Sequence, residues 1–133
     1  MITNILLYSI STDPDESQKR VRALERLDLE DGAMSVQVLQ EFYAQTTRAS
    51  RKNPLPHELA EALVESWTRF QIQDMALPIL RTALRIRRAQ RISFWDSTIV
   101  AAALSLRCDS LYSEDLNHGQ TIDGLTVVNP FRS

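Results

Sequence analysis

The residue that the sequence singles out for chemistry is Asp96, a carboxylate at the start of the most apolar helix that the chain can form. Ser93 and Asp96 have the Ser-x-x-Asp spacing of a capping box, in which the Ser93 hydroxyl accepts from first-turn amide groups. Residues 99–106 leave almost no polar face, which predicts a helix buried on most sides. Asp96 is therefore fixed beside a core, where it either only caps the helix or takes part in a site.

Two further acids can join Asp96 in space. Glu41 lies at the edge of the apolar stripe of a predicted helix, and Asp115 follows a predicted strand at 111–113. Ligands of parallel α/β sheets bind beyond the carboxyl ends of the strands, which gives the three acids a place to meet. Taken alone, a helix glutamate such as Glu41 is more often simply solvated.

The basic residues gather in one place, since five of the arginines fall within residues 81–91. Arg81, Arg85 and Arg88 recur at helical spacing on a predicted outer stripe. Three leucines of the same helix are predicted to face inward: Leu77, Leu80 and Leu84. Most such charge runs are solvated helix faces, and the alternative is a stripe that contacts RNA phosphates or a protein partner.

The elements that must position these residues alternate between short apolar segments and longer helical patterns. Strands are predicted at 33–35, 70–73, 111–113 and 125–128, while residues 2–10 fit either a buried strand or a short helix. Ser35 and Asp13 are predicted helix caps, and Trp67 is predicted to lie in the core. This alternation predicts an α/β domain with a mainly parallel sheet.

Composition limits the classes of protein that remain. The 133 residues are 44% hydrophobic and 24% charged, with a formal charge of −2, which predicts a single globular domain over residues 1–133. No apolar run approaches the ~20 residues of a membrane span, and the apolar start has no basic flank typical of a signal peptide. The single cysteine, Cys108, excludes an internal disulfide. We therefore expect a cytoplasmic protein without membrane contact, in which a local patch or a metal ion holds any phosphate partner.

Four strings carry a resemblance to a known family, and together they cover nearly the whole chain: TNILLYS (3–9), SVQVLQEF (35–42), SFWDSTIVAAAL (93–104) and LYSEDLNHGQTIDGLTVVNPF (111–131). They resemble PIN-domain ribonucleases, and most closely the VapC toxins of bacterial toxin–antitoxin pairs. The resemblance implies a three-layer α/β fold, with a mainly parallel sheet flanked by helices. It also implies an endoribonuclease that uses Mg²⁺ or Mn²⁺ to cut RNA, binds a cognate antitoxin protein and forms a homodimer.

Carried over residue by residue, the resemblance assigns Glu41, Asp96 and Asp115 as catalytic and metal-binding acids. Mg²⁺ prefers carboxylate oxygens and water, so these residue types suit that role. Four further residues match the family near the site and would support it: Thr3, Asn4, Ser113 and Glu114.

The sequence departs from the family at one position. The family motif aspartate-threonine-asparagine is Ile2-Thr3-Asn4 here, and isoleucine cannot coordinate a metal. The central first strand is then truncated to Met1 and Ile2, residues 5–10 become helical, and the exposed strand edge invites pairing with another chain. Either residues are missing before Met1, or the chain is a degenerate PIN protein that binds an antitoxin or another protein without efficient catalysis.

Overall fold

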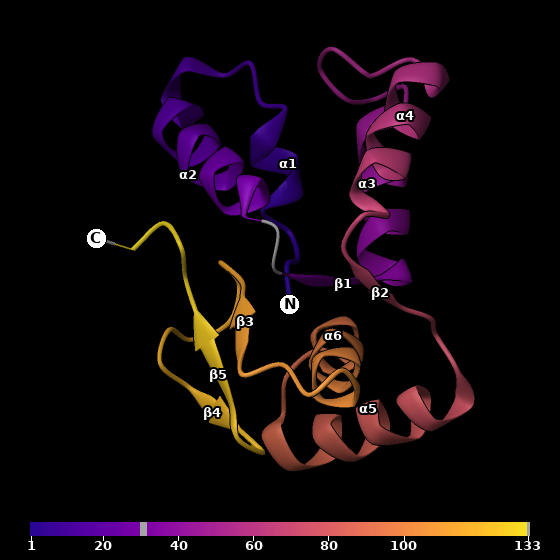
Figure 1. The fold of residues 1–133 in the computed structure, drawn as a ribbon, viewed down its shortest axis with the longest axis vertical. Coiled ribbons are helices and arrows are strands. Elements are labelled where there is room, and N and C mark those ends of the chain that lie inside the picture. Colours follow the sequence, from indigo (N-terminus) through magenta and orange to yellow (C-terminus); the bar gives the residue numbers. More distant parts are fainter. Residues whose placement is uncertain (30–31, 133) are drawn as a thin grey trace.

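The computed structural model describes residues 1–29 and 32–132, in which short strands lie between two groups of helices (Figure 1). The helices are α1 (Leu6–Ser9), a 3-10 helix (Pro14–Glu16), α2 (Ser17–Asp28), α3 (Val36–Thr47), α4 (His57–Trp67), α5 (Leu77–Gln90) and α6 (Phe94–Ser105). The strands are β1 (Ala33–Ser35), β2 (Gln71–Gln73), β3 (Ser110–Tyr112), β4 (Thr121–Ile122) and β5 (Leu125–Val128). None of the helices in these two ranges combines the length and the apolar character that crossing a membrane requires.

The strands form two small sheets that the N-terminal residues connect. β1 pairs with β2 in parallel, while β5 pairs in parallel with β3 and antiparallel with β4. The Ile2 N–H donates to the Ala33 carbonyl at 2.7 Å, and the Tyr112 N–H donates to the Met1 carbonyl at 2.9 Å. Ile2 and Tyr112 also form an isolated parallel bridge. Residues 1–2 thus act as the short central strand that was predicted, and their backbone partly covers the strand edge that we expected to be open.

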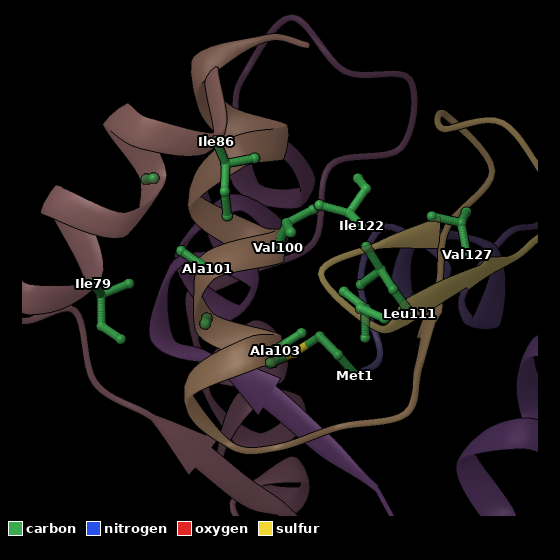
Figure 2. Close-up of a cluster of buried hydrophobic side chains, with 12 residues drawn as sticks. Met1, Ile79, Ile86, Val100, Ala101, Ala103, Leu111, Ile122 and Val127 are labelled. Carbon is green, nitrogen blue, oxygen red and sulfur yellow. The ribbon is translucent and has the colours of Figure 1, made fainter. Parts of the chain in front are cut away.

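Two hydrophobic cores lie on the two sides of this strand layer. One core joins the strands to α1–α4 and contains Ile2, Met34, Val38, Trp67 and Phe70, among other residues. The other joins α5 and α6 to β3–β5 and contains Met1, whose side chain is drawn in Figure 2. Consecutive residues that enter opposite cores are typical of a strand, which supports the assignment of residues 1–2. The layered α/β fold predicted from the sequence is therefore present.

Several helix starts follow the predicted capping chemistry. The Ser93 hydroxyl accepts from the Asp96 N–H at 3.0 Å, and the Ser35 hydroxyl accepts from the Val38 N–H at 3.3 Å. α6 is mostly buried, as its sequence predicted. Residues 2–10, for which strand and helix were both open, contain the short helix α1.

The inward face predicted for α5 is wrong. Leu77 and Leu84 are 55% and 52% exposed, whereas the buried residues of this helix are Ile79, Ala83 and Ile86. α5 carries two apolar stripes, and helical periodicity alone does not decide which of them packs. The buried stripe belongs to the same core as the alanines of α6.

Candidate functional site

Asp115 lies in the loop that follows β3, where Asn4 holds it. The Asn4 amide donates to Asp115 Oδ2 at 2.7 Å, and the Asn4 side-chain carbonyl accepts from the hydroxyl of Thr3 at 3.2 Å. The Ser113 hydroxyl accepts from the Asp115 N–H at 3.2 Å. The Thr3 hydroxyl also lies 2.6 Å from the carbonyl of Tyr112 on β3. Three of the predicted supporting residues, Thr3, Asn4 and Ser113, therefore lie around Asp115. Thr3 and Asn4 connect the end of the central strand to β3 and to the loop that follows β3.

Glu41 reaches the same region from α3. A cavity of about 380 Å³ is lined by eight residues, which are Asn4, Leu7, Tyr8, Glu16, Glu41, Gln45, Glu114 and Asp115. These residues come from the turn before α1, from α1, α3 and the 3-10 helix, and from the loop after β3. The structure thus brings Glu41, Asp115 and Glu114 together at the carboxyl ends of the strands, where ligands bind in parallel sheets.

A buried amide links Glu41 to α6. The Gln37 side-chain amide donates to Glu41 Oε1 at 3.2 Å, and its carbonyl accepts from the Thr98 hydroxyl. Gln37 and Thr98 are both buried. The Gln37–Thr98 bond joins α3 to α6, and separating the two helices would leave a buried amide without this partner, which is costly. Sequence reasoning missed Gln37, although a polar residue beside the apolar Val38 within the SVQVLQEF string is the signal that could have marked it.

Asp96 lies in the first turn of α6 and is half-buried. Burial raises the pKa of its carboxyl group, and the negative charge of Asp115 raises that pKa further, while a hydrogen bond with Ser93 lowers it. Asp96 therefore senses the charge of Asp115, although it is not among the residues that line the cavity shared by Glu41 and Asp115. Within residues 1–29 and 32–132, no three His, Cys, Asp or Glu residues are grouped as a ready-made metal cluster.

Glu114 lines the same cavity as Asp115 but forms an ion pair with a lysine. Its carboxylate lies 2.6 Å from Lys19 Nζ, and Lys19 Nζ also lies 4.8 Å from the ring centroid of Tyr8. Burial alone would raise the pKa of Glu114, but hydrogen bonds with Lys19 and Tyr8 outweigh burial and lower it. Glu114 is thus paired with a cation on α2, and no sequence signal pointed to Lys19.

The arginine stripe lies outside the acidic cavity. Arg81, Arg85 and Arg88 are exposed on α5 and do not line the acidic cavity. Arg85 forms an ion pair with Asp123 of the β4–β5 turn at 3.1 Å. Contact of this stripe with RNA or a protein partner stays a prediction.

Fold and site together define an α/β domain with acidic side chains gathered at the carboxyl ends of its strands. The PIN domain family matches residues 3–121, and the chain belongs to this family. PIN domains have a nuclease fold and generally depend on divalent metal ions such as Mg²⁺ or Mn²⁺. No curated protein matches the chain.

Proposed function

We propose that the protein is a metal-dependent endoribonuclease of the VapC type, which acts as the toxin of a bacterial toxin–antitoxin pair. The catalytic acids are Glu41, Asp96 and Asp115. One observation carries the proposal: Glu41 and Asp115 line one cavity, while the charge of Asp115 raises the pKa of Asp96. The grouping of these acids, which are distant in the sequence, supports the assignment of one acidic site in a chain that belongs to the PIN domain family.

The donor set of this region fits a hard divalent cation, because Mg²⁺ and Mn²⁺ prefer carboxylate oxygens. Asp96 and Asp115 would be the principal ligands, and Glu41 would orient the ion or a water molecule. When bound, such an ion lowers the pKa of a water nucleophile and offsets charge that develops on the phosphate.

The protein's own residues supply the positioning of these acids. Asn4 holds the Asp115 carboxylate through its amide, and Gln37 holds the Glu41 carboxylate in the same way. The Ser93 cap fixes the first turn of α6 and with it the backbone of Asp96. Each carboxylate thus starts from a defined position, which reduces the reorganisation that the reaction requires.

Cleavage of a labelled RNA with Mg²⁺, compared with the same reaction in excess chelator, tests the proposal. Asp96→Asn and Asp115→Asn should each lose about 10²-fold or more in rate, the scale observed when an electrostatic group at a reacting centre is removed. Asp74→Asn is the matched control, because Asp74 is an exposed aspartate outside the cavity. If Asp96→Asn cleaved RNA as fast as the parent, the assignment of the site would be wrong.

The toxin role carries further expectations about partners. We propose that residues 1–133 form one PIN unit that forms a homodimer in the cytoplasm and binds a cognate antitoxin protein. An apolar cavity of about 410 Å³ between α3 and α4, lined by Leu39, Tyr43 and Val64 among other residues, supports a protein partner. Expression of the parent should arrest growth and expression of Asp96→Asn should not, while light scattering of the purified protein reports the dimer. Growth arrest by both proteins would contradict a toxic activity that depends on this site.

A second candidate function is a non-catalytic PIN protein that only binds its partner. It is favoured by Ile2, which is fully buried where the family has its first metal-binding aspartate. Calorimetry with Mn²⁺ separates the two functions when the parent is compared with Ile2→Asp. Tight binding by the parent supports the nuclease, whereas binding that appears only in Ile2→Asp supports the degenerate protein.

A further inference from the structure

We infer that single-stranded RNA binds across the junction of α5 and α6, where Trp95 stacks on a base and Arg88 and Arg91 contact phosphates. The inference rests on the proposed nuclease function and adds a substrate contact to it. Trp95 and Asp96 both lie in the first turn of α6, so the proposed base contact belongs to the same helix start as the acid that we place at the reaction centre. Neither the family match nor the acidic cavity assigns a role to Trp95.

The exposure of Trp95 is the first observation. Its side chain is 60% exposed, the largest value among the exposed large hydrophobic residues in the described part of the chain. Trp67, the other tryptophan, is 4% exposed and packs edge-on against Phe42 with ring centroids 4.7 Å apart. Trp95 contacts Phe94 in a tilted arrangement, with centroids 5.2 Å apart. A large apolar ring is thus held on an ordered helix start and is open to a ligand, and every nucleic-acid base has a face that stacks on such a ring.

The charge at the junction is the second observation. α5 ends with Arg87 and Arg88 in its last turn, Arg91 follows, and all three are exposed. No acidic residue occurs between Asp74 and Asp96, so the charged side chains of α5 and of the turn that follows it are all positive. The arginines also interact favourably with the negative end of the α5 dipole. Guanidinium groups next to an exposed aromatic ring are the combination with which proteins bind single strands.

The distance along the chain keeps these groups within one binding site. Four residues lead from Arg91 to Trp95, which limits their Cα separation to roughly 14 Å. The turn is ordered, because the Arg91 N–H bonds to the Arg87 carbonyl at 3.0 Å and Ser93 caps α6. Arg85 is paired with Asp123, so the surface proposed here is the end of α5 rather than its whole arginine stripe.

Binding is measured without cleavage by adding a fluorescent single-stranded oligoribonucleotide to the 133-residue protein in chelator. Trp95→Ala should weaken binding roughly tenfold, within the range for loss of one stacked base. Trp95→Phe should restore part of the affinity because it keeps an aromatic face. RNA should also quench the tryptophan emission of the parent but not that of Trp95→Phe, in which only the buried Trp67 emits.

The arginines are tested by the salt dependence of the same binding. Each phosphate contact on a single strand contributes about 0.7 to the slope of log affinity against log salt, so Arg88→Ala combined with Arg91→Asn should reduce the slope by about 1.4. Asparagine is chosen because Arg91 has a φ of 57°, in the left-handed region that asparagine tolerates. Arg107→Asn is the matched control, since Arg107 also has a φ of 57° and is exposed beyond the other end of α6.

The outcomes separate this inference from the proposed function. RNA binding that depends on Trp95, without metal-dependent cleavage, supports the inference and contradicts the nuclease. Cleavage that is unaffected by the Trp95 and arginine variants supports the nuclease and overturns the inference. The inference is also overturned if RNA does not bind, if it binds without quenching, or if Trp95→Ala instead dissociates a dimer, because Trp95 would then belong to an interface between copies.

Discussion

Replacing Asp96 by asparagine should have opposite effects on stability with and without a metal ion. The substitution keeps the shape of the side chain and removes its charge. Burial, followed by the charge of Asp115, raises the pKa of Asp96 above its ordinary value of 3.8. A carboxyl group whose pKa rises on folding stabilises the protein below its unfolded pKa, and this contribution is lost as the pH rises through the folded pKa. At neutral pH without metal, the parent should therefore be less stable than Asp96→Asn.

The size of each effect follows from the setting of Asp96. The side chain is only half-buried, so solvent screening limits the metal-free difference to below about 1 kcal/mol. A divalent ion present at 100 times its dissociation constant would stabilise the parent by about 2.7 kcal/mol. For a domain of this length, that stabilisation corresponds to a rise in Tm of roughly 10 °C. Asp96→Asn loses a ligand and should show only a small rise, so the order of stability reverses when metal is added.

Thermal unfolding of both proteins from pH 3 to pH 8, in chelator and in Mn²⁺, measures this reversal. In chelator, the stability of the parent should fall relative to that of Asp96→Asn as the pH rises above 3.8. Asp74→Asn, which replaces an exposed aspartate, should follow the parent throughout. An equal Mn²⁺-induced shift in parent and Asp96→Asn would refute a metal role for Asp96. Greater stability of the parent in chelator at neutral pH would refute the electrostatic reasoning.

Three other substitutions test the contacts that position the site. Lys19→Met removes the partner of Glu114 and should cost up to about 1 kcal/mol. Because the pKa of Glu114 is lowered from 4.5 and that of Lys19 is raised from 10.5, the cost should appear between these values and vanish in acid and in strong base, as urea unfolding at several pH values would show. Gln37→Met should lower the free energy of unfolding by about 2 kcal/mol, as measured in urea. It should also slow RNA cleavage, because Glu41 loses its hydrogen bond with Gln37. Unchanged cleavage would show that this bond does not position Glu41. Thr3→Val leaves a strand carbonyl without its 2.6 Å partner and should lower stability by about 1–2 kcal/mol, and a neutral effect in the same assay would contradict the importance of this contact.

The parts of the fold that could be predicted from the sequence are those that depend on neighbouring residues. Ser35 and Ser93 mark helix starts because a hydroxyl can satisfy an amide three residues later, and both bonds are present. The packed face of α5 depends instead on its partner helix. Leu77 and Leu84 suit a core as well as Ile79 does, and only the contact with α6 decides between the two stripes.

The candidate site also contains residues that could be predicted from local sequence and contacts that could not. Asp115 could be located because a strand delivers it to the sheet edge, where ligands bind. The contacts of Gln37 with Thr98 and of Lys19 with Glu114 could not be predicted, because they join residues 61 and 95 positions apart along the chain. Contacts between such distant residues depend on how the layers stack, and no local pattern encodes them.

The first four residues connect the stability of the sheet to the chemistry of the site. Met1 and Ile2 join the two sheets through their backbone, and Ile2 fills the core beside Met34. The next two residues, Thr3 and Asn4, fix β3 and hold Asp115. Burial of isoleucine favours folding, whereas an aspartate at the same depth would need a nearby cation to offset its desolvation. Ile2 therefore contributes to the core, while the side-chain amide of Asn4 forms the hydrogen bond that positions Asp115.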